Sequence, residues 1–184
     1  MRPGLAMAQK ALSKIVFSSF ITGYFLFAVS AVAIDEGGQK MELTSPEFKN
    51  NDFIPKKFSA EGEDINPPLD IEGIPEGAKS LALIVEDPDA PAGTWVHWVV
   101  YDMPVVPTID EDSAPGRLGA NDSNRDGRYG GPYPPPGRPH RYIFKIYALD
   151  KVIGLKELAR KDDLERAMKG HILDKAELIG IYKR

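Results

Sequence analysis

The chain has 184 residues, a formal net charge of −4 and no cysteine, so disulfide bonds are excluded and the fold must be held by core burial. Its 17 glycines and 16 prolines indicate many turns and ordered loops rather than long helices. The acidic balance argues against nucleic acid as a partner.

The N-terminal segment has the pattern of a signal peptide. Residues 1–33 contain three basic residues and no acidic one, and residues 15–33 are uncharged and mostly apolar. Ala31 and Ala33 suit the −3 and −1 positions of a signal peptidase site, which predicts cleavage after residue 33. An uncleaved membrane anchor is the alternative, because the apolar run is about long enough to span a bilayer. Both interpretations predict export, and the membrane is a partner only if the segment stays uncleaved.

The predicted mature protein is a single exported domain, periplasmic or secreted. Because residues 1–33 contain three basic and no acidic residues, cleavage would change the formal net charge from −4 to −7. Residues 34–40 are polar and contain glycine, which predicts a flexible lead-in. Residues 41–184 show no internal repeat and no shift in composition, so we expect one domain.

The mature chain is predicted to be mainly β. Short apolar runs bounded by glycine and proline, and segments rich in β-branched and aromatic residues, predict strands. These predicted strands are 40–43, 56–59, 69–71, 81–85, 95–101, 141–149 and 177–182. Strict alternation within 95–101 would place His97 and Val99 on one face and Val96 and Trp98 on the other.

Two further segments have other patterns. Residues 108–126 are acidic, contain glycine and lack a period, which predicts a long surface loop. A short amphipathic helix is expected over residues 163–169. Asp162 and Glu165 have the spacing of a capping box, and Gly170 supplies a C-terminal stop.

Two Pro-rich loops adjoin strands that carry histidines. The sequence DPDAPAGTWVHW spans residues 87–98, and GGPYPPPGRPHRY spans residues 130–142. Each joins a stiff loop to a histidine-bearing strand, which is how a small polar pocket can be built.

Several interpretations are open for Asp87, Asp89, His97 and His140. Their spacing matches no recognised zinc pattern. A histidine with a carboxylate partner could act in acid–base catalysis, although no nucleophile motif accompanies it. A purely structural interpretation also stays open, because Asp-Pro-Asp commonly caps a turn and a strand histidine is often a satisfied core residue.

Together these segments resemble the phosphatidylethanolamine-binding protein family, which includes the Raf kinase inhibitor proteins, and they are most similar to its prokaryotic branch. The DPDAP block at 87–91 is preceded by DINPPL at 64–69 and followed by HRYIF at 140–144 and AELIGIY at 176–182. The resemblance implies a mainly β fold in which a large antiparallel sheet packs on a smaller sheet, with one or two short helices near the C-terminus.

The resemblance also implies a small anion-binding cavity. Its ligand-binding residues would be Asp87, His97, Gly131, His140 and Tyr142, and its wall would include Asp89, Pro91, Pro134 and Pro135. Imidazole, phenol and backbone N–H groups can donate hydrogen bonds to phosphate oxygens. Asp87 would instead orient a histidine, or bind an ammonium group or a protonated phosphate oxygen.

Four further features of the sequence have other interpretations. Arg141 alternates with Tyr142 and is expected to point away from the cavity. Tyr133 and the short segment 92–94 depart from the eukaryotic members of the family, which puts kinase regulation in doubt. His171 is expected at the helix end, with no chemical role.

The predicted function is that of an exported module that binds a small anionic or phosphorylated ligand, with phospholipid head groups among the candidates. No catalytic residue, metal or cofactor is expected, and the expected compartment is a bacterial periplasm or the medium. The alternatives are a protein-interaction or inhibitor module that regulates a kinase or protease through the same pocket, and an enzyme acting on a phosphate ester or peptide.

Overall fold

The computed structural model describes residues 40–123 and 126–184. The strands are β1 (Glu42–Thr44), β2 (Asp52–Phe53), β3 (Leu69–Glu72), β4 (Ser80–Asp87), β5 (Trp95–Met103), β6 (Thr108–Ile109), β7 (Arg117–Leu118), β8 (His140–Leu149) and β9 (Ile172–Tyr182). A 3₁₀ helix spans Lys56–Phe58, and α1 spans Lys161–Met168. No helix of the described part is long and apolar enough to cross a membrane. The predicted signal peptide and nearly all of the predicted lead-in lie outside the described residues.

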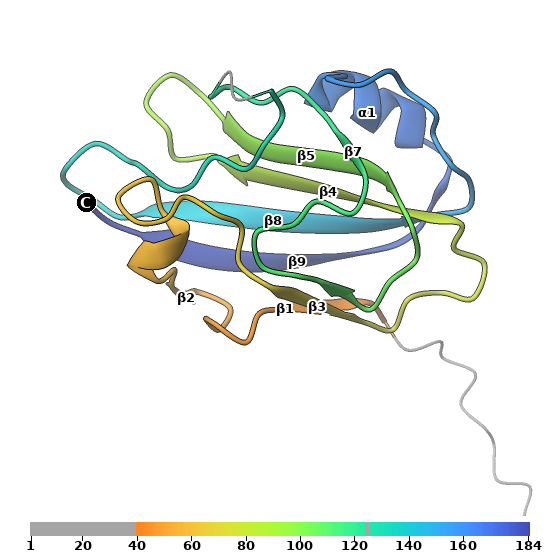
Figure 1. The fold of residues 1–184 in the computed structure, drawn as a ribbon, viewed down its shortest axis with the longest axis horizontal. Coiled ribbons are helices and arrows are strands. Elements are labelled where there is room, and N and C mark those ends of the chain that lie inside the picture. The colour runs from red at the N-terminus through yellow and green to blue at the C-terminus, as the bar shows by residue number, and fades with distance from the viewer. Residues whose placement is uncertain (1–39, 124–125) are drawn as a thin grey trace, which may run out of the picture. The chain divides into compact units, whose positions relative to one another are not determined.

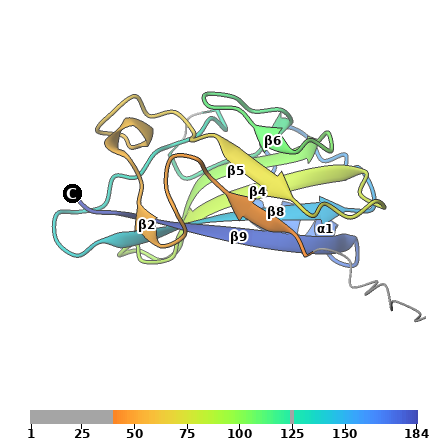
Figure 2. The same ribbon diagram turned by 90° about the horizontal axis from the view of Figure 1, so that it is seen from below.

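The strands form two sheets (Figure 1). The large sheet has the order β2-β9-β8-β4-β5-β7, and its neighbours are antiparallel except for the parallel pair of β2 and β9. The small sheet has the antiparallel order β1-β3-β6. In Figure 2 the small sheet lies in front of the large sheet and α1 lies behind it. The predicted mainly β fold of two sheets is confirmed.

Each face of the large sheet buries its own hydrophobic core. Between the sheets, Ile71 and Ile109 of the small sheet pack with residues of the large sheet such as Phe144. On the opposite face, Leu164 and Met168 of α1 pack against a second set of buried residues. Burial of apolar area at about 25 cal/mol per Å² therefore stabilises both faces, without any disulfide.

Most predicted strands are confirmed, but the one at 56–59 is wrong. Pro55 has a φ of −56°, and the Phe58 N–H donates to the Pro55 carbonyl at 3.0 Å, so this segment turns as a 3₁₀ helix. The predicted loop at 108–126 also contains two strands of two residues each, β6 and β7. Strands this short leave no periodic pattern in the sequence.

The predicted alternation along β5 is wrong because a β-bulge interrupts it. Val85 of β4 pairs with Trp98, but the next residue of β4 pairs with Val96, so His97 is the extra residue. Val96 therefore packs on the α1 face together with Val99, while Trp98 lies between the sheets. The bulge sets the orientation of His97 relative to both neighbours.

The predicted helix exists, but its N-terminal cap differs. α1 begins at Lys161, its N-cap is Arg160, and no side chain caps it, so the predicted capping box is wrong. Asp162 lies in the first turn, where a negative charge is favourable. Gly170 has a φ of +82°, and this left-handed conformation confirms the predicted stop.

Candidate functional site

A cavity of about 400 Å³ opens where the end of β4 and the starts of β5 and β8 meet the Pro-rich loop after residue 129. All five predicted ligand-binding residues line it: Asp87, His97, Gly131, His140 and Tyr142. Three predicted wall residues, Pro91, Pro134 and Pro135, line it as well. The antiparallel pairing of β4 with both neighbours brings these segments together at one edge of the sheet.

Asp87 and His140 form a buried polar pair. His140 Nδ1 lies 2.7 Å from Asp87 Oδ2, and the two side chains are only 5% and 4% exposed. Because an ionised carboxylate can only accept, Nδ1–H donates to Asp87. Asp87 Oδ1 also accepts the Asp89 N–H at 2.8 Å. Asp87 therefore caps a turn, as the structural interpretation has it, and also orients a histidine.

His97 enters the cavity from β5. Its Nδ1 lies 2.6 Å from the Gly130 carbonyl oxygen, which can only accept, so this nitrogen also donates. The His97 ring meets the Tyr142 ring edge-to-face, with 5.1 Å between centroids. Burial lowers the pKa of His97, against the opposing effects of the Gly130 bond and the charge of Asp87.

Both histidines thus use Nδ1 to contact the protein. Within residues 40–123 and 126–184, neither His97 Nε2 nor His140 Nε2 has a hydrogen-bond partner, and both side chains line the cavity. With Nδ1–H committed, the neutral form of each ring offers a lone pair at Nε2. Only the protonated form offers a donor there.

Tyr142 completes the floor and is 1% exposed. Burial raises the pKa of its phenol, and both the charge of Asp87 and a hydrogen bond with Asp87 raise it further. The phenol therefore stays protonated and donates toward Asp87.

Gly131 has a different role from the expected contact with a ligand. A Cβ there would lie 2.5 Å from the Phe58 carbonyl oxygen and 2.8 Å from the Ser59 backbone. The Gly131 N–H donates to Asp64 Oδ1 at 2.7 Å. Gly131 thus permits a close approach between two chain segments, and its amide is committed to Asp64.

Asp64 is a lining residue that sequence reasoning missed. It belongs to the DINPPL segment used for the resemblance, but no local pattern indicates that it contacts the Pro-rich loop 67 residues later. It has a φ of +61°, a conformation that aspartate tolerates better than most residues. This left-handed turn brings the carboxylate to the cavity.

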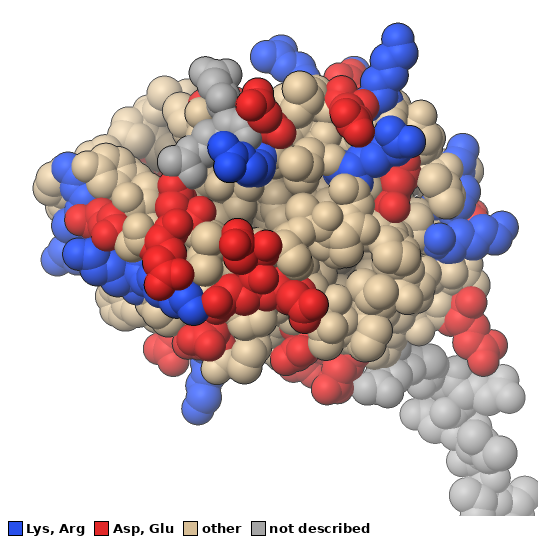
Figure 3. Space-filling model, in the orientation of Figure 1, with Lys and Arg blue, Asp and Glu red and all other residues tan. Residues whose placement is uncertain are grey.

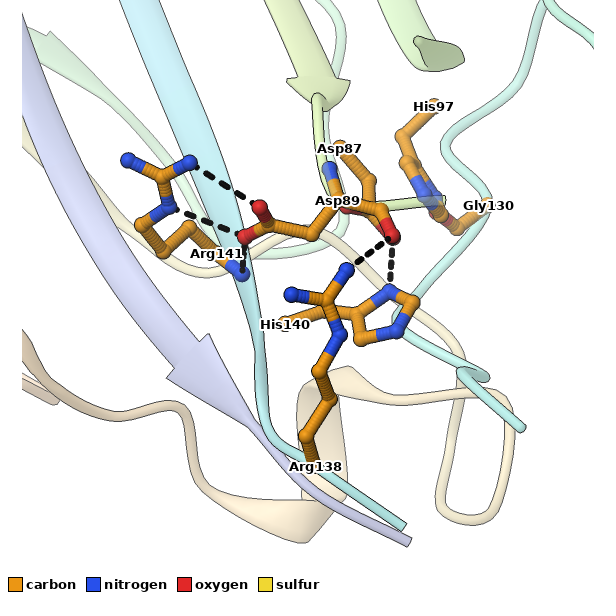
Figure 4. Close-up of polar contacts among 7 residues, drawn as sticks. All are labelled: Asp87, Asp89, His97, Gly130, Arg138, His140 and Arg141. Atoms are coloured by element: carbon orange, nitrogen blue, oxygen red, sulfur yellow. Dashed lines mark hydrogen bonds and ion pairs between the residues drawn. The ribbon is translucent and has the colours of Figure 1, made fainter. Parts of the chain in front are cut away.

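Asp89 does not belong to the lining, which corrects the prediction that it forms part of the pocket wall. Its two carboxylate oxygens each lie 2.9 Å from a guanidinium nitrogen of Arg141. Figure 4 shows this pair on one side, with His97 and Gly130 on the other. Arg141 therefore points away from the cavity, as its alternation with Tyr142 predicts.

The lining is acidic, and its rim is aromatic. It includes the carboxylates of Asp64 and Asp87, and among the described residues no lysine or arginine lines it. Trp95 and Tyr133 also line it, although 40% and 56% of these residues stay exposed. In the described part of the chain, no group of three or more His, Cys, Asp or Glu residues could hold a metal ion.

The described geometry agrees with the comparisons with known proteins. A family model for phosphatidylethanolamine-binding protein matches residues 44–183. The chain belongs to this family. This confirms the predicted resemblance, and the family fold together with the cavity supports a ligand-binding module.

Curated relatives are close in sequence and come from archaea as well as bacteria. A UPF0098 protein of Pyrococcus abyssi is 47% identical over 158 residues, which cover 80% of this chain and 88% of that protein. A UPF0098 protein of Aquifex aeolicus is 44% identical over 92% of this chain and 99% of its own length. The prokaryotic branch is therefore supported, without a restriction to bacteria.

Two solved structures share the fold. The phosphatidylethanolamine-binding protein homologue CT736 of Chlamydia trachomatis is 43% identical, with a TM-score of 0.75 over 79% of this chain and 98% of its own. E. coli YbcL, described as a member of the mammalian family, is 29% identical, with a TM-score of 0.73 over 79% of this chain and 99% of its own.

Proposed function

We propose that the protein is a non-catalytic module that binds a small anionic or phosphorylated ligand in this cavity. The observation that carries the proposal is that His97 and His140, from different strands, line one cavity and have both Nδ1 atoms fixed by protein acceptors. Two imidazoles held in this way can turn Nε2 toward a shared ligand. Protonation of both rings would strengthen the binding of an anion and weaken the binding of a cation.

An anion that has no proton of its own, such as sulfate, requires a proton on the ring that donates to it. A neutral ring with Nδ1–H committed has an acceptor at Nε2, which repels an anion, whereas the protonated ring donates a charge-assisted bond. His140 Nδ1 contacts a carboxylate, that of Asp87. His97 contacts a neutral carbonyl, and burial lowers its pKa.

The acidic lining favours particular anions. A phosphate monoester that keeps one proton can donate that proton to Nε2 or to a carboxylate. A head group with an ammonium group could pair that group with Asp87, which lines the cavity. Phospholipid head groups are therefore candidate ligands.

Calorimetry with sulfate tests the proposal, since sulfate keeps its charge over the range in which histidine titrates. Binding should be tighter at about pH 5.5 than at about pH 8. His97→Ala and His140→Ala should each weaken binding about tenfold at the lower pH, and the double variant should lose the pH dependence. His171→Ala is the control, because its Nδ1 pairs with Asp150 outside the lining. Unchanged binding in the double variant would contradict the proposal.

A protein-interaction module is the second candidate, and the exposed Trp95 and Tyr133 favour it. Exposed aromatic residues beside a pocket suit a partner that inserts an acidic or phosphorylated side chain. Native mass spectrometry of the protein from its own compartment separates the two, since a retained small ligand supports the first candidate. Hydrolysis of phosphate esters or peptides that is lost in His140→Ala would establish catalysis instead, because an Asp–His pair can also act as a base.

The proposal includes export, on the signal-peptide pattern of residues 1–33. The mature protein should begin near Ile34, in a periplasm or in the medium. N-terminal sequencing of the protein from cells measures this directly, and an intact Met1 start in membranes would indicate an anchor.

A further inference from the structure

An anion entering this cavity meets charge of its own sign. Asp64 and Asp87 line the cavity, and among the described residues no lysine or arginine does. The surface is acidic as well, and Figure 3 shows Asp and Glu side chains gathered over the middle and lower left of one face. A positive charge near the entrance would therefore raise the affinity for an anion.

Such a charge lies at the rim, on a residue that the sequence did not single out. The Arg184 guanidinium carbon lies 4.2 Å from the centroid of the Tyr133 ring. Tyr133 lines the cavity, and 56% of it is exposed. The register explains this position, because Tyr182 of β9 pairs with His140, so the chain passes the cavity edge just before Arg184.

The contact leaves the guanidinium free to bind. A cation–π contact does not use the N–H groups as donors to an acceptor atom, and no hydrogen bond joins Arg184 to another described residue. Arg138 is less available, because its Nη2 donates to the Asp89 carbonyl oxygen at 3.2 Å. Tyr133 thus holds Arg184 at the entrance and restricts its motion.

We propose that Arg184, positioned by Tyr133, is a specificity-determining residue that selects anionic ligands at the entrance. This inference rests on the proposed function. Arg184 supplies a positive charge at the entrance, speeds the entry of anions and contributes a charge-assisted bond to an anionic group at the rim. Tyr133, a position where the chain departs from eukaryotic relatives, gains a role as the support for the guanidinium.

The test is sulfate and inorganic phosphate binding at low and high ionic strength. Arg184→Gln should weaken binding about fivefold at low salt, and the difference from wild type should shrink at high salt because the charge is exposed. Lys183→Gln is the matched control, since it removes the same charge from the neighbouring residue. It should change affinity less than about twofold.

Variants of Tyr133 distinguish the positioning of Arg184 by the aromatic ring from the effect of the Arg184 charge itself. Tyr133→Phe keeps the ring and should bind as wild type does, while Tyr133→Leu should lose about half of the free-energy contribution of Arg184. Circular dichroism confirms that each variant is folded. If Arg184→Gln and Lys183→Gln behave alike while wild type binds sulfate, the role of Arg184 is overturned and the proposed function stands. If wild type binds neither anion, both are overturned.

Discussion

Glu86 and Asp87 are neighbours on β4, both buried, yet they lie on opposite faces of the large sheet in very different surroundings. Glu86 faces α1, where its carboxylate contacts the ammonium groups of Lys145 and Lys161. Asp87 faces the cavity, where its partners are the His140 imidazole, the Asp89 backbone amide and the Tyr142 phenol.

The difference separates a structural carboxylate from a functional one. Burial opposes ionisation of Glu86, but the hydrogen bonds from Lys145 and Lys161 outweigh it, so its pKa lies below the usual value. The two lysine ammonium groups neutralise the charge of the Glu86 carboxylate. The carboxylate of Asp87 instead contacts the imidazole of His140, and the cavity opens on the other side of that ring.

Glu86→Gln should have the largest effect on stability. The change leaves two lysines that are only about one-fifth exposed without their carboxylate, which costs about 2 kcal/mol. Sulfate affinity should hardly change, since Glu86 lies outside the lining. Urea unfolding measures the first quantity and calorimetry the second. A large loss of sulfate binding with unchanged stability would show that Glu86 acts in binding and does not stabilise the fold.

The pH dependence sharpens the same point. Because the pKa of Glu86 is lowered in the folded state, its contribution to stability is present above its unfolded value of about 4.3 and is lost as pH falls through the lowered folded value. Glu86→Gln should therefore flatten the acid limb of the stability curve.

Asp87→Asn should reduce sulfate affinity more than it reduces stability, the opposite of Glu86→Gln. Asparagine can still accept the Asp89 N–H through its side-chain oxygen, so we expect a stability loss of no more than about 1 kcal/mol. Loss of the carboxylate weakens the acceptor that orients the His140 ring, so sulfate affinity should fall about tenfold. Binding that is equally tight in Asp87→Asn would mean that Asp87 only caps its turn.

Asp89→Asn should have the smallest effect of the three. The hydrogen bonds from the Arg141 side chain lower the pKa of Asp89 to about 2, but half of Arg141 is exposed, so solvent screens the pair and its contribution to stability is small. That contribution is present above the unfolded value of about 3.9 and is lost as pH falls toward 2. Acid unfolding followed by circular dichroism measures the change, and sulfate binding should not alter.

Much of the fold could be predicted from local patterns, because the long strands carry the periodic or apolar signals that burial requires. The two-residue strands β6 and β7 carry no such signal, since their pairing depends on the rest of the sheet. The bulge at His97 was equally invisible, because it is defined by the partner strand.

The site was predicted mainly through the resemblance, and the structure refines it. Which nitrogen of each histidine faces the cavity depends on Asp87 and Gly130, both far from their partner in sequence. Asp64 and Arg184 were missed for the same reason, since only tertiary contacts bring them to Gly131 and Tyr133. Asp89 was misplaced because a carboxylate two residues from Asp87 is directed to Arg141 instead.

The central claim is that an anion enters this cavity together with a proton carried by the pocket histidines. Calorimetry of sulfate binding at about pH 7, in two buffers with different ionisation enthalpies, counts the protons taken up. The wild-type protein should take up about one proton for each sulfate bound. The His97→Ala, His140→Ala double variant should take up none. Tight sulfate binding by wild type with no proton uptake would contradict the claim.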